Sequence, residues 1–192
     1  PCHEIGLRFL RATDPITGAG GGGQFCNLSA AVMRSEDTVK TFAEKVRLAT
    51  WIGVMQASFT NFPYLRKGWK QTCVEDCLLG VDITGQCDNP FLSQNEDAMS
   101  YFNQVAINTA RKASSVIGVN MPVAITCGKP SGNTSQLVDC ASGFHPRYSK
   151  YYFRHVRIAA HDPLCQMVRD QGLPMFKETG EEERADKDVT TW

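Results

Sequence analysis

The amino-acid sequence predicts an α/β fold with parallel strands. Two long helical patterns, at residues 35–59 and 93–117, alternate with two short apolar patterns, at residues 78–83 and 122–127. Helices and strands that alternate at this spacing are typical of units in which a helix connects two parallel strands. The chain of 192 residues fits one domain. Hydrophobic residues make up 42% of the sequence, which is enough to form a core.

The N-terminal region combines an extended segment with a glycine-rich one. Apolar residues alternate within residues 1–12, as they do in a strand. Residues 17–23 contain too many glycines for a regular element, and the lysine and hydroxyl residue of a Walker phosphate loop do not follow them. We therefore expect a flexible loop that connects Cys2 to Cys26.

Both helical patterns begin with residues that favour a helix start. Ser35 precedes two acidic residues and a threonine, and the helical spacing continues to about Phe59, shortly before Pro63. The second helix is expected to begin at Ser93, which forms a capping box with Glu96 three residues later.

The two apolar patterns predict short buried strands. Residues 78–83 read Leu-Leu-Gly-Val-Asp-Ile and are followed by Gly85. Residues 122–127 read Pro-Val-Ala-Ile-Thr-Cys and lead into a loop of small polar residues. Together with the two helices they form the expected parallel unit.

Charge and apolar content exclude several classes of partner. Lysine and arginine number 20 and aspartate and glutamate number 20, so no overall field indicates nucleic acid or a membrane surface. No apolar run approaches the roughly 20 residues that span a bilayer, and no signal-peptide pattern opens the chain. We expect a soluble, cytoplasmic protein whose phosphate binding comes from local geometry.

Eight cysteines are present. The chain is long for a disulfide scaffold and has a core-forming composition, so we expect reduced thiols of which a few are chemically special. Cys140 and Cys165 are expected to be structural. Cys73, Cys77 and Cys87 lack a fourth ligand for structural zinc, so no metal is expected.

Two cysteines have neighbours that favour chemistry. Cys2 and Glu4 lie two residues apart on an extended segment, and this spacing directs a thiol and a carboxylate to the same side. Cys26 follows across the glycine-rich loop, which could bring both sulfurs into one pocket. The alternatives are a structural cysteine beside a surface glutamate, and a small buried hydrophobic residue at position 26.

A candidate phosphate-binding loop follows the last apolar pattern. Residues 126–136 read Thr-Cys-Gly-Lys-Pro-Ser-Gly-Asn-Thr-Ser-Gln. Small residues allow the backbone to approach a ligand, and hydroxyl and N–H groups at a helix start attract phosphate oxygens. Basic residues follow within thirty positions, at His145, Arg147, Arg154 and Arg157. The aromatic residues at 148–153 could stack on a base, although core packing is the expected role.

These segments together resemble the adenosylcobalamin-dependent, or class II, ribonucleotide reductases, and particularly their ribonucleoside-triphosphate branch. The family's active-site loop, Asn-Pro-Cys-Gly-Glu-Ile, is matched by residues 1–5 except that His3 replaces glycine. Its second cysteine motif is matched by residues 26–29, and its phosphate loop by residues 129–136 with Asn133 in place of threonine. Further matches lie at residues 45–50, 79–85, 141–149 and 162–164.

The resemblance implies a fold and a set of roles. It implies the second half of a ten-stranded α/β barrel at residues 1–176, including an active-site finger loop and incomplete without partner chains, followed by a charged, flexible tail at 177–192. Cys2 would be the thiyl radical that removes the 3′-hydrogen of the ribose, Glu4 would accept the proton of the 3′-hydroxyl, and Cys26 would be one of two reducing thiols. The residues implied to hold the substrate phosphates are Pro130, Ser131, Gly132, Asn133, Thr134 and Ser135.

The resemblance also implies partners. Adenosylcobalamin would be bound mainly by partner segments, and a thioredoxin-like dithiol would be the external reductant. The second reducing cysteine, the effector loops and the carboxy-terminal cysteine pair of the family are not found here. We therefore expect N-terminal and C-terminal portions of the same reductase as partners, in a split enzyme or around a fragment, and no catalysis by this chain alone.

Three alternatives stay open. The chain could be a non-catalytic fragment that binds nucleotide or supports the assembly, and His3 and Asn133 leave room for this. It could be part of a class I large subunit, whose radical-relay tyrosines would lie beyond it. It could also be a zinc-binding interaction module. The substrate could be a diphosphate or a triphosphate, because the loop recognises phosphate without counting it.

Overall fold

The computed structural model describes residues 5–14, 16, 19–153, 155–177 and 189–191. The chain divides into two compact units, Pro1–Arg147 and Tyr148–Trp192. The predicted boundary at residue 176 stays a prediction. Residues 178–188 of the predicted tail lie outside the described residues.

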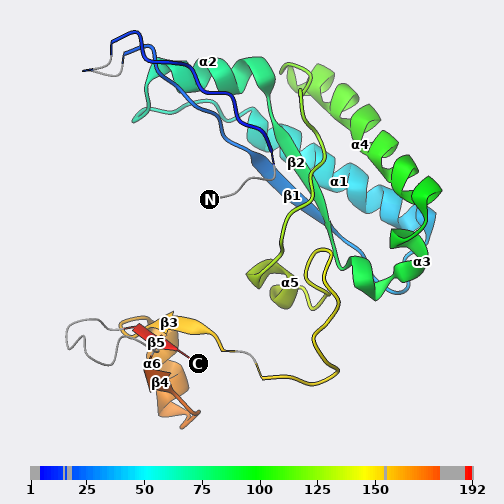
Figure 1. The fold of residues 1–192 in the computed structure, drawn as a ribbon, viewed down its shortest axis with the longest axis vertical. Helices are drawn as coiled ribbons and strands as arrows, with labels where there is room; N and C mark the ends of the chain where they lie inside the picture. The colour runs from blue at the N-terminus through cyan, green and yellow to red at the C-terminus, as the bar shows by residue number, and fades with distance from the viewer. Residues whose placement is uncertain (1–4, 15, 17–18, 154, 178–188, 192) are drawn as a thin grey trace. The chain divides into compact units, whose positions relative to one another are not determined.

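The first unit contains the predicted parallel α/β arrangement. Strands β1 (Asn27–Val32) and β2 (Leu79–Thr84) pair in parallel over their whole length. Helices α1 (Val39–Ala57) and α4 (Glu96–Ile117) pack against each other on one side of these strands (Figure 1). Helix α2 (Lys67–Asp76) leads from α1 into β2. The sequence patterns missed β1, whose residues are mostly half-buried and include few that favour strands.

Both long helices are confirmed, although each begins at a different cap from the one predicted. The N-cap of α1 is Thr38 rather than Ser35, and its hydroxyl accepts a 3.2 Å hydrogen bond from a first-turn amide in a capping box. The N-cap of α4 is Asn95, which accepts a 3.0 Å bond from a first-turn amide. Ser93 instead ends the short helix α3 (Pro90–Ser93). In both cases a polar side chain nearer the helix provides the cap.

The second predicted strand, residues 122–127, forms only in part. Residues 124–127 exchange three backbone hydrogen bonds of 2.8 to 3.1 Å with β2, but a single bridge, Val81 with Thr126, has strand geometry. The amides of Leu79 and Val81 lie two residues apart and bond to adjacent carbonyls. This uneven spacing interrupts the ladder.

The glycine-rich segment is packed where it is described. Leu10 and Gly22 exchange reciprocal backbone bonds of 2.8 and 3.2 Å, so the chain returns antiparallel to residues 8–13. A Cβ atom on Gly22 would lie 2.3 Å from the backbone of Gly68 in α2, so this close approach requires glycine. Residues 17 and 18 of the predicted flexible loop lie outside the described residues.

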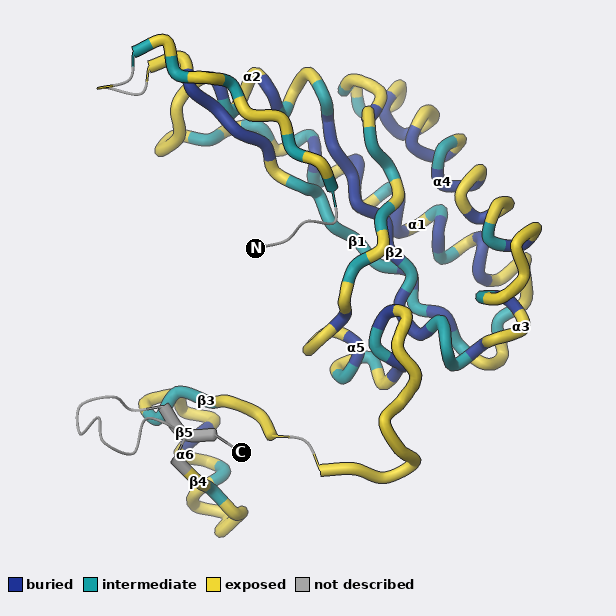
Figure 2. Tube along the Cα trace, viewed as in Figure 1, coloured by how far each residue is buried: buried dark blue, intermediate teal, exposed yellow. Residues whose placement is uncertain are grey.

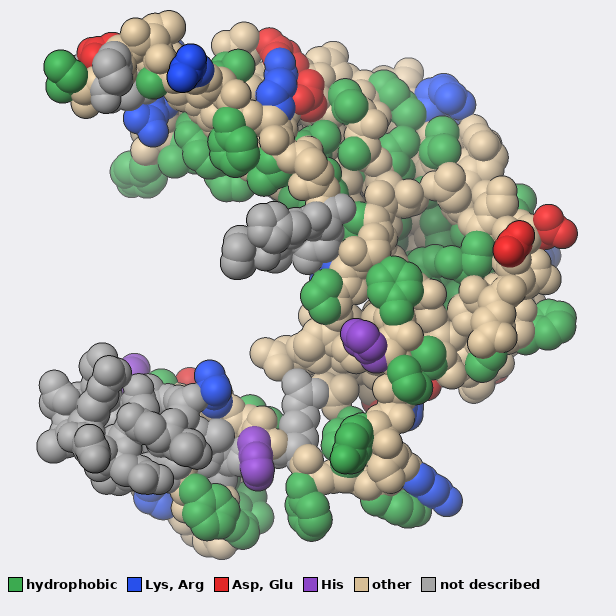
Figure 3. Space-filling model, in the orientation of Figure 1, with side chains coloured by type: hydrophobic (Ala, Val, Ile, Leu, Met, Phe, Trp, Pro, Cys, Tyr) green, Lys and Arg blue, Asp and Glu red, His purple; other side chains and the backbone are tan. Residues whose placement is uncertain are grey.

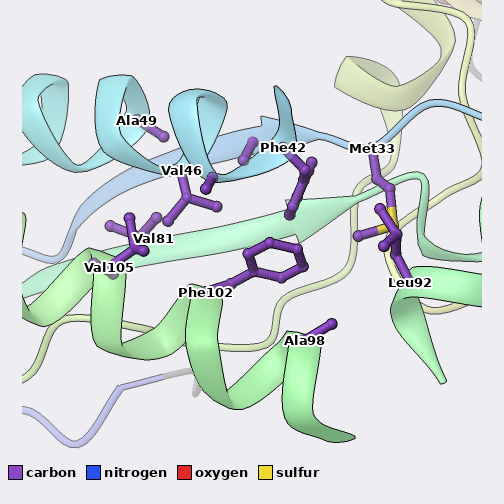
Figure 4. Packing of buried hydrophobic residues seen from close by; sticks show 12 residues of the cluster. Met33, Phe42, Val46, Ala49, Val81, Leu92, Ala98, Phe102 and Val105 are labelled. Atoms are coloured by element: carbon purple, nitrogen blue, oxygen red, sulfur yellow. The ribbon is translucent and has the colours of Figure 1, made fainter. Parts of the chain in front are cut away.

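The hydrophobic core lies between the sheet and the two long helices. Phe42 of α1 and Phe102 of α4 meet edge to face, with ring centroids 4.8 Å apart and an interplanar angle of 74°. Figure 4 shows this pair beside Val46 and Val81. Strand β2 is buried along most of its length, as Figure 2 shows. The core therefore fixes one face of the sheet.

The second unit is small. Strands β3 (Arg157–Ala159), β5 (Val189–Thr191) and β4 (Phe176–Lys177) form an antiparallel sheet in that order, and α6 (Pro163–Asp170) buries Cys165. The prediction that the preceding aromatic residues pack in a core is wrong, because they lie in a stretch without helix or strand and are exposed: Tyr148, Tyr151, Tyr152 and Phe153. Within the described parts of the chain, no helix is both long and apolar enough to cross a membrane.

Candidate active site

The two faces of the sheet differ in what covers them. Leu79 and Val81 of β2 belong to the core beneath α1 and α4. Side chains alternate along a strand, so Gly80, Asp82 and Thr84 point to the opposite face. We call this second face, defined by Gly80, Asp82 and Thr84, the loop face.

Three chain segments meet at Gly80 on the loop face. A Cβ atom on Gly80 would lie 2.5 Å from the side chain of Leu28, 3.0 Å from that of Ile5 and 3.1 Å from Sγ of Cys127. The absence of a side chain at Gly80 therefore allows the N-terminal segment and the strand before the phosphate loop to approach the sheet.

The predicted reducing thiol, Cys26, immediately precedes β1 and is half-buried. The next residue, Asn27, donates its amide to the carbonyl of Leu78 at 3.2 Å, which keeps the chain extended beside β2. Alternation extended one residue before β1 predicts that Cys26 shares a side with Leu28, and hence the loop face.

The predicted radical cysteine and base, Cys2 and Glu4, lie outside the described residues, so their roles stay predictions. Ile5, the next residue, contacts the loop face at Gly80.

The candidate phosphate loop begins at the loop face. The amide of Lys129 donates to Oδ1 of Asp82 at 3.2 Å, and Asp82 is only 1% exposed. Helix α5 (Asn133–Leu137) follows, as the sequence predicted. Its N-cap is Gly132, and no side chain caps its first turn. Uncapped amides at a helix start suit an anion.

The hydroxyl groups of the loop do not all face outward. Ser135 is fully buried, and its hydroxyl donates to the carbonyls of Ser131, at 2.6 Å, and Gly132, at 2.8 Å. Ser131 is 3% exposed. These two serines therefore shape the loop, whereas four of the predicted phosphate-binding residues are exposed: Pro130, Gly132, Asn133 and Thr134.

The far end of the loop is held by polar side chains that sequence reasoning missed. The hydroxyl of Thr84 donates to the carbonyl of Ala141 at 3.2 Å and accepts from the amide of Gly143 at 3.1 Å. Asp88, in the short helix η1 (Gln86–Asp88), accepts from the amide of Ala141 at 2.7 Å. A signal existed, because Asp82 and Thr84 are polar residues in an otherwise apolar strand.

Two arginines near the loop form their ion pairs and hydrogen bonds within the protein. Arg147 pairs with Asp88 at 3.1 Å and with Asp139 at 2.9 Å, and hydrogen bonds to these carboxylates raise the pKa of its guanidinium. Arg34 donates to the carbonyls of Val138 and Asp139. These side chains line a polar hollow of about 360 Å³. Of the other predicted basic residues, His145 and Arg157 are exposed and Arg154 lies outside the described residues.

The cysteines expected to be ordinary are free thiols, and the structure does not bring the three cysteines of the zinc alternative together. Cys77 precedes β2 and Cys87 follows it, so the six-residue strand separates them by about 20 Å. Burial, followed by the neighbouring thiol of Cys73, raises the pKa of Cys77. Among the described residues, no cluster of three or more histidine, cysteine or acidic side chains could hold a metal ion.

The described residues do not fit adenosylcobalamin by themselves. The hollows that they line measure about 210 to 390 Å³. Sites that enclose a drug-sized ligand measure roughly 300 to 1,000 Å³, and a corrin is larger than such ligands. A cobalamin site would therefore need chain beyond the residues described.

The similarity of this chain to known proteins agrees with the resemblance that its motifs indicate. No family model matches the chain. A stretch of 76 residues is 38% identical to the adenosylcobalamin-dependent ribonucleoside-triphosphate reductase of Lactobacillus acidophilus, and 68 residues are 37% identical to that of Lactobacillus helveticus. The enzyme of the same name from Levilactobacillus brevis is 27% identical over 81 residues.

Parts of this chain are similar in sequence to adenosylcobalamin-dependent ribonucleoside-triphosphate reductases. The three matches cover 35% to 41% of this chain and 9% to 11% of those reductases. A crystal structure of a B12-dependent (class II) ribonucleotide reductase is similar to 88% of this chain and 26% of that one, with a TM-score of 0.59 and 16% identity. The predicted resemblance is confirmed, and the chain has the fold of part of the solved reductase.

Proposed function

We propose that this chain is a catalytic component of a ribonucleotide reductase, which converts ribonucleotides to 2′-deoxyribonucleotides for DNA synthesis. The observation that carries the proposal is that the phosphate loop begins at Asp82 on the loop face, the face to which alternation assigns Cys26. The chain is also similar to three reductases. The substrate would be a ribonucleoside triphosphate or diphosphate.

The spacing along the sheet supports the proposal. Asp82, which holds Lys129 at the start of the loop, lies opposite Ala30 in β1. Cys26 precedes Ala30 by four residues, which corresponds to about 13 Å of strand. This separation is comparable with the length of a nucleotide, so one substrate could place its phosphates at the loop and its sugar near the thiol.

The proposed roles follow from the chemistry of each group. Cys2 would remove the 3′-hydrogen of the ribose as a thiyl radical, and Glu4 would accept the 3′-hydroxyl proton while the 2′-hydroxyl leaves as water. Cys26 would be one of two thiols that reduce the sugar and end as a disulfide. Residues 130–135 would bind the phosphates, with Asn133 and Thr134 as the exposed side chains.

The proposed cofactor and reductant come from outside the described residues. Adenosylcobalamin, when bound by partner segments, would supply the initial radical. A thioredoxin-like dithiol would return Cys26 and its partner thiol to the reduced state after each turnover.

Exposed apolar side chains on α1 and beyond its end support the proposed partner segments. Leu48, Ile52, Met55 and Phe59 are 52% to 73% exposed and follow one another at intervals of three or four residues, so on the helix they lie on one side. Hydrophobic side chains also reach the surface over much of the visible face of the first unit (Figure 3). We propose that other portions of the same reductase cover them and complete a ten-stranded barrel of which this chain is the second half.

The test is nucleotide reduction by the reductase that contains this chain, supplied with adenosylcobalamin and a dithiol. Cys2→Ser is expected to abolish deoxynucleotide formation, and Cys26→Ser to abolish turnover. Cys165→Ser is the matched control, since its thiol is buried in the second unit. Full activity of Cys2→Ser, or an assembled reductase without product, would leave only a binding or structural role.

A further inference from the structure

The N-terminal segment is tied to the rest of the first unit by one buried amide. Gln24 is 4% exposed. Its Oε1 accepts a 2.6 Å hydrogen bond from the backbone amide of Arg8, and its Nε2 donates to the carbonyl of Thr72 at 3.2 Å and to Oδ2 of Asp76. One side chain thereby joins the N-terminal segment, α2 and the chain that enters β1.

The orientation of this amide is fixed by its partners. A side-chain amide carries two N–H donors and one acceptor oxygen. The Thr72 carbonyl and the Asp76 carboxylate only accept, whereas the Arg8 amide only donates. In the reversed orientation, the side-chain NH2 group of Gln24 would face the N–H donor of Arg8, and its oxygen would face the acceptors of Thr72 and Asp76. All three hydrogen bonds would be lost. Gln24 therefore holds the Arg8 amide in one place.

Further contacts strengthen the same connection. The guanidinium of Arg8 bonds to Asp76 at 3.0 Å and to Glu75, and hydrogen bonding to Arg8 lowers the pKa of Glu75. Two residues beyond Arg8, Leu10 pairs with Gly22. The segment is thus fixed at two backbone positions, Arg8 and Leu10.

The hydrogen bond between Gln24 and the Arg8 amide lies close in sequence to both proposed reacting thiols. Arg8 follows Glu4 by four residues and Cys2 by six, and Gln24 precedes Cys26 by two. Because residues 5–8 form one continuous segment, a displacement at Arg8 is expected to shift Ile5, which contacts Gly80 on the loop face. Radical transfer and reduction at one sugar require both thiols in reach of the same substrate, and misplacement by 1 Å can cost about 100-fold in rate.

We propose that Gln24, held by Asp76, is a positioning residue for the reductase reaction. Its amide holds residues 5–10, which directly follow Glu4 in the sequence, against the chain that leads to Cys26. This inference rests on the proposed function and adds a residue that positions the described chain next to both proposed reacting segments.

The test uses the assembled reductase and the isosteric change Gln24→Glu. This change turns a donor into an acceptor against Asp76, so amide hydrogen exchange over residues 5–10 is expected to accelerate. The value of kcat is expected to fall about 100-fold, with KM unchanged because other contacts hold the phosphate loop. Adding Asp76→Asn restores a donor between the two side chains and is expected to recover much of the lost kcat.

Two further variants complete the experiment. Gln24→Met removes the hydrogen bonds without adding charge, so it serves if Gln24→Glu does not fold. Gln104→Glu makes the same chemical change at an exposed glutamine of α4, and is expected to leave exchange and kcat as in the wild type.

Either of two results would overturn the inference: unchanged exchange at residues 5–10 in the Gln24 variants, or faster exchange with wild-type kcat. Both are read against an active wild-type enzyme. An inactive wild-type assembly, or an active Cys2→Ser variant, instead contradicts the proposed function, so the two failures are distinguishable.

Discussion

The helix-covered face and the loop face of the same two strands are built by different interactions. Beneath α1 and α4, Leu79 and Val81 join Phe42 and Phe102 in an apolar core. On the loop face, residues 5–10, 19–26 and 128–143 are mostly loops, apart from the short helix α5, and polar side chains bond to their backbone.

This contrast shows how a scaffold and a site can share one sheet. Apolar burial is strong but has no direction, so it stabilises the unit without specifying the position of any single group. Hydrogen bonds are directional and bring defined backbone atoms to defined places. If this division holds, substitutions on the helix-covered face should mainly change stability, whereas those on the loop face should also change substrate handling.

The largest expected effect is on the helix-covered face. Phe102→Ala removes a ring that is 1% exposed and in contact with Phe42, and is expected to lower the free energy of unfolding by about 3 to 5 kcal/mol. Chemical denaturation of the purified protein measures this loss in the free energy of unfolding. Tyr101→Ala, at a half-exposed aromatic residue next in the chain, should cost much less. Equal losses would show that the core does not carry the stability assigned to it.

The next effect distinguishes the two faces directly. Thr84→Val keeps the shape of a fully buried side chain but leaves the amide of Gly143 and the carbonyl of Ala141 without the hydroxyl. We expect a loss of about 1 to 3 kcal/mol in unfolding free energy, together with a higher KM for nucleotide because the phosphate loop shifts.

Thr50→Val is the matched control on the helix-covered face. Thr50 is also fully buried, but its hydroxyl donates to the carbonyl of Val46 within the same helix, so its removal leaves the loops in place. A smaller loss of stability and an unchanged KM are expected. A raised KM in Thr50→Val, or an unchanged one in Thr84→Val, would remove the distinction between the faces.

The two faces also differ in how far the sequence could predict them. On the helix-covered face, apolar periodicity identified α1, α4 and β2, because each of them buries one side or both. Strand β1 was missed, since pairing with β2 rather than its own composition makes it a strand. The caps were misplaced because several polar residues stand before each helix and local spacing does not select among them.

On the loop face, motifs selected Cys26 and residues 130–135 as candidates but gave no indication of the contacts around them. Gln24 and Thr72 lie 48 residues apart, and Thr84 and Gly143 lie 59 apart. No periodicity connects such positions, so only the folded chain reveals them. The buried serines of the phosphate loop show the same limit, because a motif indicates which residues are present but not which way their hydroxyls point.

A smaller effect tests the cap that the structure reveals. Thr38→Ala removes the capping box at the start of α1 and is expected to cost about 1 kcal/mol of unfolding free energy. Ser35→Ala, at the cap that the sequence predicted, should cost less, since Ser35 is exposed and bonds only to its neighbour Glu36 among the side-chain contacts described. The reverse order in thermal or chemical unfolding would favour a helix that begins earlier.

The smallest expected effect is on how the free energy of unfolding depends on pH. It concerns Asp37, a hydrogen-bonded carboxylate just before the start of α1. Burial acts to raise the pKa of Asp37, but hydrogen bonds from Lys45 at 2.6 Å, the Arg34 amide at 2.8 Å and the Thr41 hydroxyl at 3.0 Å outweigh it and lower the pKa below its usual range. The folded state therefore binds this proton less readily than the unfolded state does. The carboxylate stabilises the fold above the unfolded pKa of about 3.9, and this contribution is lost as the pH falls through the lower folded value.

Asp37→Asn is accordingly expected to unfold more easily than the wild type at neutral pH, with the difference narrowing below about pH 4. Unfolding curves collected between neutral and acidic pH measure this difference. Lys45→Met removes one of the three hydrogen-bond donors and should reduce the same pH-dependent difference without abolishing it. If the difference in unfolding free energy between Asp37→Asn and the wild type stays constant from neutral to acidic pH, Asp37 contributes by its shape rather than by its charge. Directional polar contacts would then matter on the loop face alone.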